Sequence, residues 1–228
     1  MPSNDSVLVS AKNLEYAYPG HDPVLQIKEL TLKAGEHVFL HGPSGTGKTT
    51  LLGLLSGVLI AGSGVLEILG KELSSLSPAE RDHFRGHNIG YIFQVFNLIP
   101  YLTVAENILL PLRFRSNDVA KEASEKLSHL AEQLNIFQLL QKKASDISVG
   151  QAQRVAAARS LIAAPPIVLA DEPTSSLDSD NREDFIKTLF NTTKETGSTV
   201  IFVSHDHSLS SLFPKNLELA DINEASHR

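Results

Sequence analysis

Four short runs of consecutive apolar residues stand out along the chain, at residues 38–40, 89–93, 167–170 and 200–203. A strand that is buried on both faces has such an unbroken run, and helical patterns separate the four runs. This alternation predicts an α/β fold with a mainly parallel sheet covered by helices. Three more runs, at residues 7–9, 24–27 and 65–68, predict an N-terminal β region. The last two are expected to be antiparallel because their connections are short.

Capping sequences of the form Ser/Thr-x-x-Glu predict two helix starts. One runs from Ser77 to Glu80 and has Pro at its first helical position, and the other runs from Thr103 to Glu106. A further helix is predicted at residues 118–134, where apolar residues recur three or four positions apart and the charged residues form a solvated outer face. The apolar face consists of Val119, Ala123, Leu127, Leu130 and Leu134. The segment 98–146 is helix-rich and interrupts the strand alternation, which indicates an inserted subdomain.

Composition narrows the class of protein. A chain of 228 residues with 42% hydrophobic and 20% charged residues is typical of a soluble globular protein with one domain. Its net charge of −6 argues against a general nucleic-acid binder. The absence of cysteine excludes disulfides, thiolate metal sites and a cysteine nucleophile. No secretory signal is evident, and the longest apolar stretch, residues 51–61, is too short to cross a bilayer. We therefore expect a cytoplasmic protein whose membrane role, if any, goes through a partner.

Residues 42–49, Gly-Pro-Ser-Gly-Thr-Gly-Lys-Thr, fit the pattern G-x-x-x-x-G-K-[ST] between an apolar strand-like run and a helix-like run. Glycines let backbone N–H groups turn toward an anion, and the positive end of the following helix points at the same place. The pattern predicts binding of a nucleoside triphosphate, with Lys48 on the β and γ phosphates and the Thr49 hydroxyl on Mg²⁺. The predicted nucleotide-binding residues here are Gly42, Pro43, Ser44, Gly45, Thr46, Gly47, Lys48, Thr49 and Thr50.

Two carboxylates follow the third buried run. Asp171 and Glu172 come directly after residues 167–170, so they should lie at the carboxyl edge of the sheet, where α/β proteins bind ligands. Asp171 is predicted to hold Mg²⁺, and Glu172 to orient or deprotonate the attacking water. The alternative is that the pair forms an acidic cap on the next helix.

A histidine follows the fourth buried run. His205 is predicted to hydrogen-bond a γ-phosphate oxygen, because a polar strand end at the carboxyl edge faces the ligand. His41, which precedes the glycine-rich loop, is the nearest rival. A structural role for a single histidine is the simpler alternative.

Residues 148–155, Ser-Val-Gly-Gln-Ala-Gln-Arg-Val, resemble the signature of ATP-binding cassette (ABC) ATPases. Other family marks occur in the expected order over nearly the whole chain: Tyr18 as the aromatic residue that stacks on adenine, Gln94 after residues 89–93, Ser-Ser-Leu-Asp at 175–178, and His205. Tyr16 is the alternative to Tyr18, and either tyrosine could instead be a half-buried strand residue.

The resemblance implies a homodimer in which ATP on the loop of one chain is covered by the signature of the other. Ser148, Gly150 and Gln151 would contact that ATP through a hydroxyl, a backbone N–H and a helix N-terminus. It also implies a single domain over residues 1–228, with a RecA-like core at 1–94 and 156–228 and a helical subdomain at 95–155. The implied catalytic residues are Glu172, His205, Lys48 and Gln94, and the implied metal ligands are Thr49, Gln94 and Asp171.

The signature, Ile-Ser-Val-Gly at residues 147–150, departs from the family pattern at one position that matters. The family normally has Leu-Ser-Gly-Gly, whereas Val149 stands here in place of the first glycine of that pair. A β-branched residue restricts both the backbone φ angle and close approach. Either φ is negative and Val149 is tolerated, or the contact across the dimer is weakened and turnover is slow. Hydrolysis is still expected because Glu172 is present.

Residues 93–100 and 106–112 resemble the lipoprotein-release and macrolide-efflux branch. That branch implies an ATP-hydrolysing subunit on the cytoplasmic face of the inner membrane, coupled to a permease with four membrane helices. The apolar residues at 95–102 would contact this permease, or else pack within the subdomain. The alternative function is a non-transport ATPase that regulates cell-wall hydrolases through a membrane partner. Soluble ABC proteins of DNA repair or translation and simple P-loop kinases fit the motifs less well.

Overall fold

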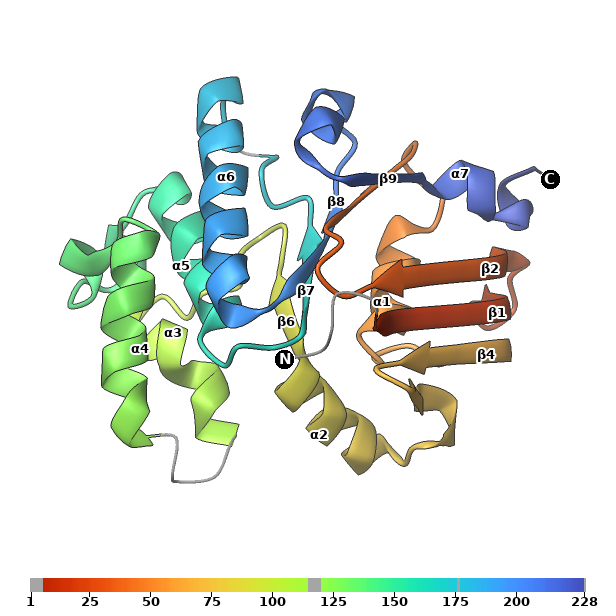
Figure 1. Ribbon diagram of the computed structural model, residues 1–228, viewed down its shortest axis with the longest axis horizontal. Helices are drawn as coiled ribbons and strands as arrows, with labels where there is room; N and C mark the ends of the chain where they lie inside the picture. The colour runs from red at the N-terminus through yellow and green to blue at the C-terminus, as the bar shows by residue number, and fades with distance from the viewer. Residues whose placement is uncertain (1–5, 115–119, 176, 228) are drawn as a thin grey trace. The chain divides into compact units, whose positions relative to one another are not determined.

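The computed structural model describes residues 6–114, 120–175 and 177–227. The chain divides into two compact units, one made of Met1–Arg85 with Ile201–Arg228 and the other of Gly86–Val200. These bounds differ from the expected division into a core at 1–94 and 156–228 and a helical subdomain at 95–155, and that functional division stays a prediction. Each unit has its own helices and strands (Figure 1).

The first unit contains an antiparallel sheet of four strands in the order β2-β1-β4-β5 (Figure 1). Its strands are β1 (Val7–Ala17), β2 (Pro23–Lys33), β4 (Ser63–Ile68) and β5 (Lys71–Glu72). The expected antiparallel β region is present, and both β2 and β4 pair antiparallel with β1. The strands β2 and β4 do not pair with each other, and because both are antiparallel to β1 they run in the same direction. In β2 the buried residues alternate with less buried ones, but they change face along the strand: Leu25 and Ile27 are buried in its first half, and Leu30 and Leu32 in its second.

The same unit holds three parallel strands in the order β8-β3-β9. In this group β3 (Val38–His41) pairs with β8 (Thr199–Val203) through residues 38–40 and 201–203, and with β9 (Lys215–Glu218) on its other side. The rings of Phe39, Phe202 and Phe213 pack together, with centroids 5.2 to 6.3 Å apart. The helix α1 (Lys48–Leu55) follows β3 through the glycine-rich loop. The C-terminal part of the chain adds η6 (His207–Leu212), α7 (Leu219–Ile222) and η7 (Glu224–His227).

The second unit combines a parallel strand pair with several helices. Its strands β6 (Ile89–Ile92) and β7 (Ile167–Asp171) pair in parallel, with Gly90 opposite Val168. Its helices are α3 (Val104–Leu109), α4 (Ala120–Gln133), α5 (Val149–Leu161) and α6 (Ser179–Thr196), of which α4 and α6 lie side by side in Figure 1. Short 3-10 turns, η2 (Leu110–Phe114), η4 (Phe137–Leu139) and η5 (Ala144–Asp146), connect them. The helix α5 lies so close to β6 that a Cβ on Gly90 would come within 2.3 Å of the Ser160 carbonyl oxygen.

Both predicted capping boxes are present. The backbone N–H of Ser77 donates to Glu80 at the start of α2 (Pro78–Asn88), which begins in the first unit, and η1 (Leu73–Ser75) precedes it. Thr103 and Glu106 cap α3 reciprocally. Leu130 of α4 and Leu134, which directly follows this helix, are buried, whereas Val119 lies outside the described residues. Among the described residues, none of the helices combines the length and apolar character that a membrane span requires.

Candidate functional site

The glycine-rich loop uses its glycines for backbone conformations that other residues avoid. Gly42, Gly45 and Gly47 have φ angles of 148°, 85° and 99°. Gly47 is also the N-cap of α1, and a Cβ there would lie 2.8 Å from Leu25 Cδ2 of β2. Both the positive φ and the close approach of Leu25 therefore favour glycine at Gly47. A run of such conformations can turn backbone N–H groups toward an anion.

Lys48 is folded over this loop. Its Nζ donates to the carbonyl oxygens of Gly42 and Pro43, both at 2.8 Å. The Thr46 hydroxyl also donates to the Pro43 carbonyl, at 2.9 Å. Thr49, the predicted magnesium ligand, is exposed at the first turn of α1. The loop thus presents an ammonium group and a hydroxyl at one helix N-terminus, which suits a polyphosphate.

The structure brings Tyr18 to the helix that follows the loop. Its hydroxyl lies 3.2 Å from the Thr50 hydroxyl, and its side chain is 41% exposed. The ring of Tyr16 meets that of Tyr18 edge-on, with centroids 5.1 Å apart. Because Tyr18 is anchored at the loop and still exposes its ring, it is the better placed of the two tyrosines for stacking on a base.

The two candidate histidines lie in different surroundings. His205 is exposed directly after β8, where the Ser204 N–H donates to the Leu40 carbonyl of β3 at 3.2 Å. His41 instead packs edge-on against His207, with ring centroids 4.5 Å apart, and its Nδ1 is buried. Burial lowers the pKa of His41, and the nearby His207 lowers it further. The arrangement favours His205 over His41 for contact with a ligand.

In the second unit, the two carboxylates stand where β7 ends. Asp171 is the last residue of β7, and Glu172 follows it with a left-handed φ of 47°. The Tyr91 hydroxyl, on the neighbouring strand β6, hydrogen-bonds Asp171; burial raises the pKa of Tyr91 and the Asp171 carboxylate raises it further. The cap of the next helix, α6, is Asp178, which accepts from Asn181 N at 3.0 Å. The acidic pair is therefore not the helix cap, which removes the simpler alternative for it.

The signature residues form the start of α5. Ser148 is the N-cap, and a capping box joins it to Gln151: Ser148 N donates to Gln151 Oε1 at 3.0 Å, and Gln151 N donates to Ser148 Oγ at 3.4 Å. Val149 is the first helical residue, is 55% exposed, and does not have a positive φ. A Cβ on Gly150 would meet only Leu177 Cδ2, at 3.7 Å. Packing within the described chain thus does not require glycine at Gly150, and the backbone tolerates Val149.

An arginine on the signature helix holds the loop after Gln94. Arg159 of α5 donates from Nη1 to the Asn97 carbonyl at 2.7 Å and from Nη2 to the Phe96 carbonyl at 2.5 Å. Gln94 itself is exposed in the turn that follows β6, and Val95 next to it is 80% exposed. The loop that carries Gln94 is thereby tied to the helix that begins at Ser148.

The described geometry places the predicted site residues in two sets. The first unit holds the glycine-rich loop, Tyr18 and His205, and the second holds Gln94, Asp171, Glu172 and the signature residues. Their individual roles remain predictions. Tyr91 and Arg159 were not predicted from the sequence, because each acts through a contact that no local pattern reveals.

Comparison with known proteins identifies the family. Residues 25–175 match the sequence model of the ABC transporter family. The chain belongs to this family. It is 38% identical over 202 residues to the bacitracin export ATP-binding protein BceA of Halalkalibacterium halodurans, covering 87% of this chain and 79% of that protein. It is 35% identical over 215 residues to the lipoprotein-releasing system ATP-binding protein LolD of Porphyromonas gingivalis, covering 94% and 97%.

A solved ABC cassette has the same fold. The dimeric post-hydrolysis structure of the ATP-binding cassette MJ0796, bound to ADP and Pi, superposes with a TM-score of 0.81 at 34% identity, over 92% of this chain and 94% of that one. The predicted α/β fold of a P-loop cassette is confirmed. This ABC protein is therefore an ATP-binding subunit and an ATPase of the LolD-like branch.

Proposed function

We propose that this ABC ATPase acts as one half of a homodimer that closes on ATP and drives a membrane permease of the lipoprotein-release or macrolide-export type. The observation that carries the proposal is the double hydrogen bond from Arg159 to the Phe96 and Asn97 carbonyls. It ties the loop of Gln94 and exposed Val95 to the helix that starts at Ser148. A displacement of α5, for example when its N-terminus binds a nucleotide, would then also move the exposed apolar loop.

The signature is suited to a nucleotide that arrives from outside the chain. Ser148 is exposed at a helix N-terminus, and Gly150 leaves space where a side chain could stand. A helix N-terminus attracts phosphate, and backbone N–H groups bind it closely when no side chain intervenes. The dimeric cassette MJ0796 supports a paired arrangement for this chain as well. We infer that Ser148, Gly150 and Gln151 cover ATP held by the loop of the second copy.

The loop and the two strand ends supply the groups that hydrolysis requires. Lys48 would leave the Gly42 and Pro43 carbonyls to neutralise phosphate charge. Thr49, Gln94 and Asp171 offer hydroxyl, amide and carboxylate oxygens, which are the ligands that suit Mg²⁺, and that ion would supply a compensating positive charge. Glu172 would orient the attacking water and accept its proton, and His205 would donate a hydrogen bond to the γ-phosphate.

The apolar residues after Gln94 would form the contact with the permease. Val95 is 80% exposed and Tyr101 is 75% exposed, whereas Leu98, Ile99 and Leu102 are partly buried. Exposed apolar side chains beside a nucleotide-sensing residue are suited to bind a partner. The permease would hold the homodimer at the cytoplasmic face of the inner membrane.

Val95→Asp should disrupt this coupling, because a carboxylate placed at an 80% exposed apolar position must be desolvated when the partner binds. In pull-downs with the affinity-tagged chain from detergent-solubilised membranes, we expect about tenfold less permease to be recovered. This fall corresponds to a loss of about 1.4 kcal/mol in binding free energy. The copurified membrane protein is identified and quantified by mass spectrometry.

The matched control is Val58→Asp, which places the same charge at a position that is 65% exposed in the other unit. It should leave recovery of the permease unchanged. Equal loss with both variants, or normal recovery with Val95→Asp, would contradict the assigned contact. If the copurified membrane protein is a regulator of cell-wall hydrolases, the alternative function applies.

Val149→Gly should increase ATP turnover by about twofold to tenfold, provided that the branched side chain limits approach of the partner's phosphate. Because φ at Val149 is not positive and the side chain is 55% exposed, its own chain does not need glycine there. Glycine at an exposed helix position costs about 1 kcal/mol of stability, so melting is recorded alongside phosphate release. Unchanged or slower turnover of the folded variant would show that Val149 does not restrict the contact.

A further inference from the structure

Asn223 is a buried polar residue directly after α7, with 1% of its surface exposed. Its Nδ2 donates to the carbonyl oxygens of Val24 at 2.9 Å and Thr46 at 3.1 Å. Its Oδ1 accepts from the backbone N–H of Gln26 at 2.8 Å and of Ala225 at 3.2 Å. An asparagine amide has two donor hydrogens and two acceptor lone pairs, and all four are used here. One side chain therefore joins the phosphate-binding loop, β2 and the C-terminal segment.

The bond to Thr46 fixes part of the loop's geometry. The Thr46 carbonyl and the Gly47 N–H belong to one peptide unit, and in a planar trans peptide these two groups point in opposite directions. When Asn223 holds the carbonyl oxygen, it also sets the direction of the Gly47 N–H. Gly47 is the N-cap of α1, so this N–H is one of the loop groups that can face a phosphate. Asn223 thus acts on the anion-binding loop without any contact to nucleotide.

The C-terminal segment meets the loop at a second point. Leu219 of α7 is buried, and its Cβ lies 3.8 Å from the place where a Cβ on Gly42 would stand. Strand β2 supports the loop from Leu25, 2.8 Å from the corresponding position on Gly47. The C-terminal segment therefore lies beside the first glycine of the loop and, through Asn223, bonds its later part.

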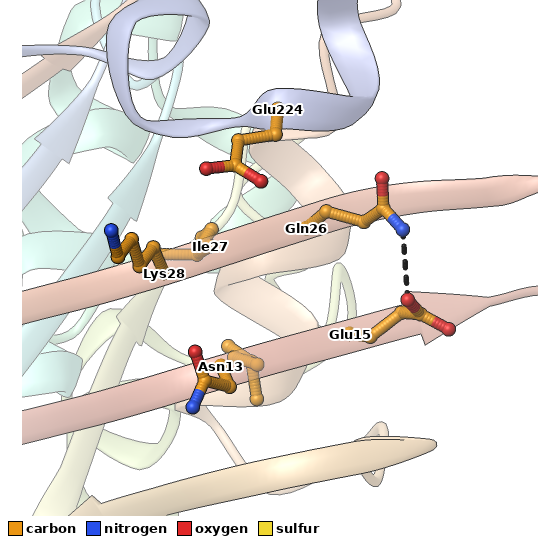
Figure 2. Close-up of a pocket in the computed structure, with 7 residues that line it drawn as sticks. Asn13, Glu15, Gln26, Ile27, Lys28 and Glu224 are labelled. Carbon is orange, nitrogen blue, oxygen red and sulfur yellow. Dashed lines mark hydrogen bonds between the residues drawn. The ribbon is translucent and has the colours of Figure 1, made fainter.

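The surroundings explain why an amide is needed and a carboxylate would fail. Figure 2 shows Glu224 of the C-terminal segment over β2, where the Gln26 side chain donates to Glu15 at 2.8 Å. Glu15 and Glu224 line a cavity of about 390 Å³ on this side of the sheet. A carboxylate in place of the Asn223 amide would face the carbonyl oxygens of Val24 and Thr46 without a donor hydrogen.

We propose that Asn223 is a positioning residue for the ATPase reaction, which sets ATP affinity by holding the Thr46 carbonyl of the phosphate-binding loop. The proposal rests on the nucleotide site described above. A role confined to fold stability makes a different forecast, because it would lower the melting temperature and the active fraction while leaving the KM for ATP unchanged.

The test compares wild type, Asn223→Ala and Asn223→Asp by steady-state ATPase kinetics, below the melting temperature of each variant. We expect Asn223→Ala to raise the KM for ATP by about tenfold, which corresponds to the loss of one well-formed buried hydrogen bond. The value of kcat should stay within about threefold of wild type. Asn223→Asp should raise KM further. If N223D does not fold, Asn223→Ala alone decides the outcome.

Two control variants separate the bond to Thr46 from other effects. Glu224→Ala changes the neighbouring exposed residue and should leave KM unchanged. Ala225→Pro removes the Ala225 N–H that donates to Asn223 and restricts the backbone at Glu224 and Ala225, but leaves the bond from Asn223 to Thr46 in place. It should lower the melting temperature with little change in KM. An unchanged KM in Asn223→Ala, or an equal rise in Ala225→Pro, would overturn the proposal. A wild-type chain without ATPase activity would instead overturn the nucleotide site itself.

Discussion

Glu172→Gln should slow ATP turnover by about 10²- to 10⁴-fold and trap an ATP-bound homodimer that elutes as a dimer in size-exclusion chromatography. Glutamine keeps the size of the side chain but cannot accept a proton from the attacking water. The backbone at Glu172 is fixed by a left-handed φ of 47° and by the Ser175 N–H, which donates to its carbonyl at 3.2 Å. Phosphate release and chromatography with saturating ATP and Mg²⁺ measure the two effects.

The charge-matched control is Glu183→Gln on α6. Glu183 is exposed and pairs with Lys187 at 3.0 Å, so this variant removes one carboxylate from the same unit without touching the strand ends. It should retain normal turnover, because exposed ion pairs contribute little to stability. If Glu172→Gln remains monomeric with saturating ATP, the shared-site arrangement is wrong.

The buried strands were the easiest elements to predict, because burial on both faces leaves an unbroken apolar run. All four predicted core strands occur, as β3, β6, β7 and β8, within one residue of the expected bounds. The strand β9 was not predicted. It reads Lys-Asn-Leu-Glu, lies at the end of its sheet, and is only partly buried, so hydrophobic pattern gives no signal for it.

Pairing partners were less predictable than the strands themselves. The short connections indicated that residues 24–27 and 65–68 are antiparallel strands. Each is antiparallel to β1, which lies between them, so the two run in the same direction and do not pair with each other. A run of sequence specifies that a strand forms and which face is buried, whereas the partner depends on which apolar faces can be buried together.

Site residues likewise divide into those that a local sequence pattern reveals and those that act through distant contacts. Glycines, capping residues and strand-end carboxylates act within a few positions of one another, so a local pattern reveals them. Arg159, Tyr91 and Asn223 act across the fold: Arg159 reaches a carbonyl 63 positions earlier in the chain, and Asn223 one 177 positions earlier. No spacing rule links such partners, and only the folded chain shows them.

Lys48 illustrates how a local motif gains its effect from the fold. Its ammonium donates to two carbonyl oxygens of its own loop, those of Gly42 and Pro43. Charge-assisted hydrogen bonds of this kind are each worth about 1.5 to 3 kcal/mol. An incoming triphosphate offers oxygens with full negative charge, which compete successfully with neutral carbonyls. If Lys48 binds the phosphates as predicted, these contacts already hold its side chain at the loop, so little side-chain freedom would be lost on binding.

Lys48→Ala should abolish measurable ATP binding, because losing two phosphate hydrogen bonds of about 1.5 kcal/mol each weakens affinity by more than 100-fold. Isothermal titration calorimetry with ATP and Mg²⁺ measures the loss. Lys48→Arg keeps the charge and should retain part of the affinity, whereas Lys12→Ala removes an exposed cation from β1 in the same unit and should bind normally. Because Lys48 also donates hydrogen bonds to the Gly42 and Pro43 carbonyls, its loss could affect the fold of the loop. Circular dichroism must therefore show that the variant is folded. Normal ATP affinity in folded Lys48→Ala would contradict the loop as the phosphate site.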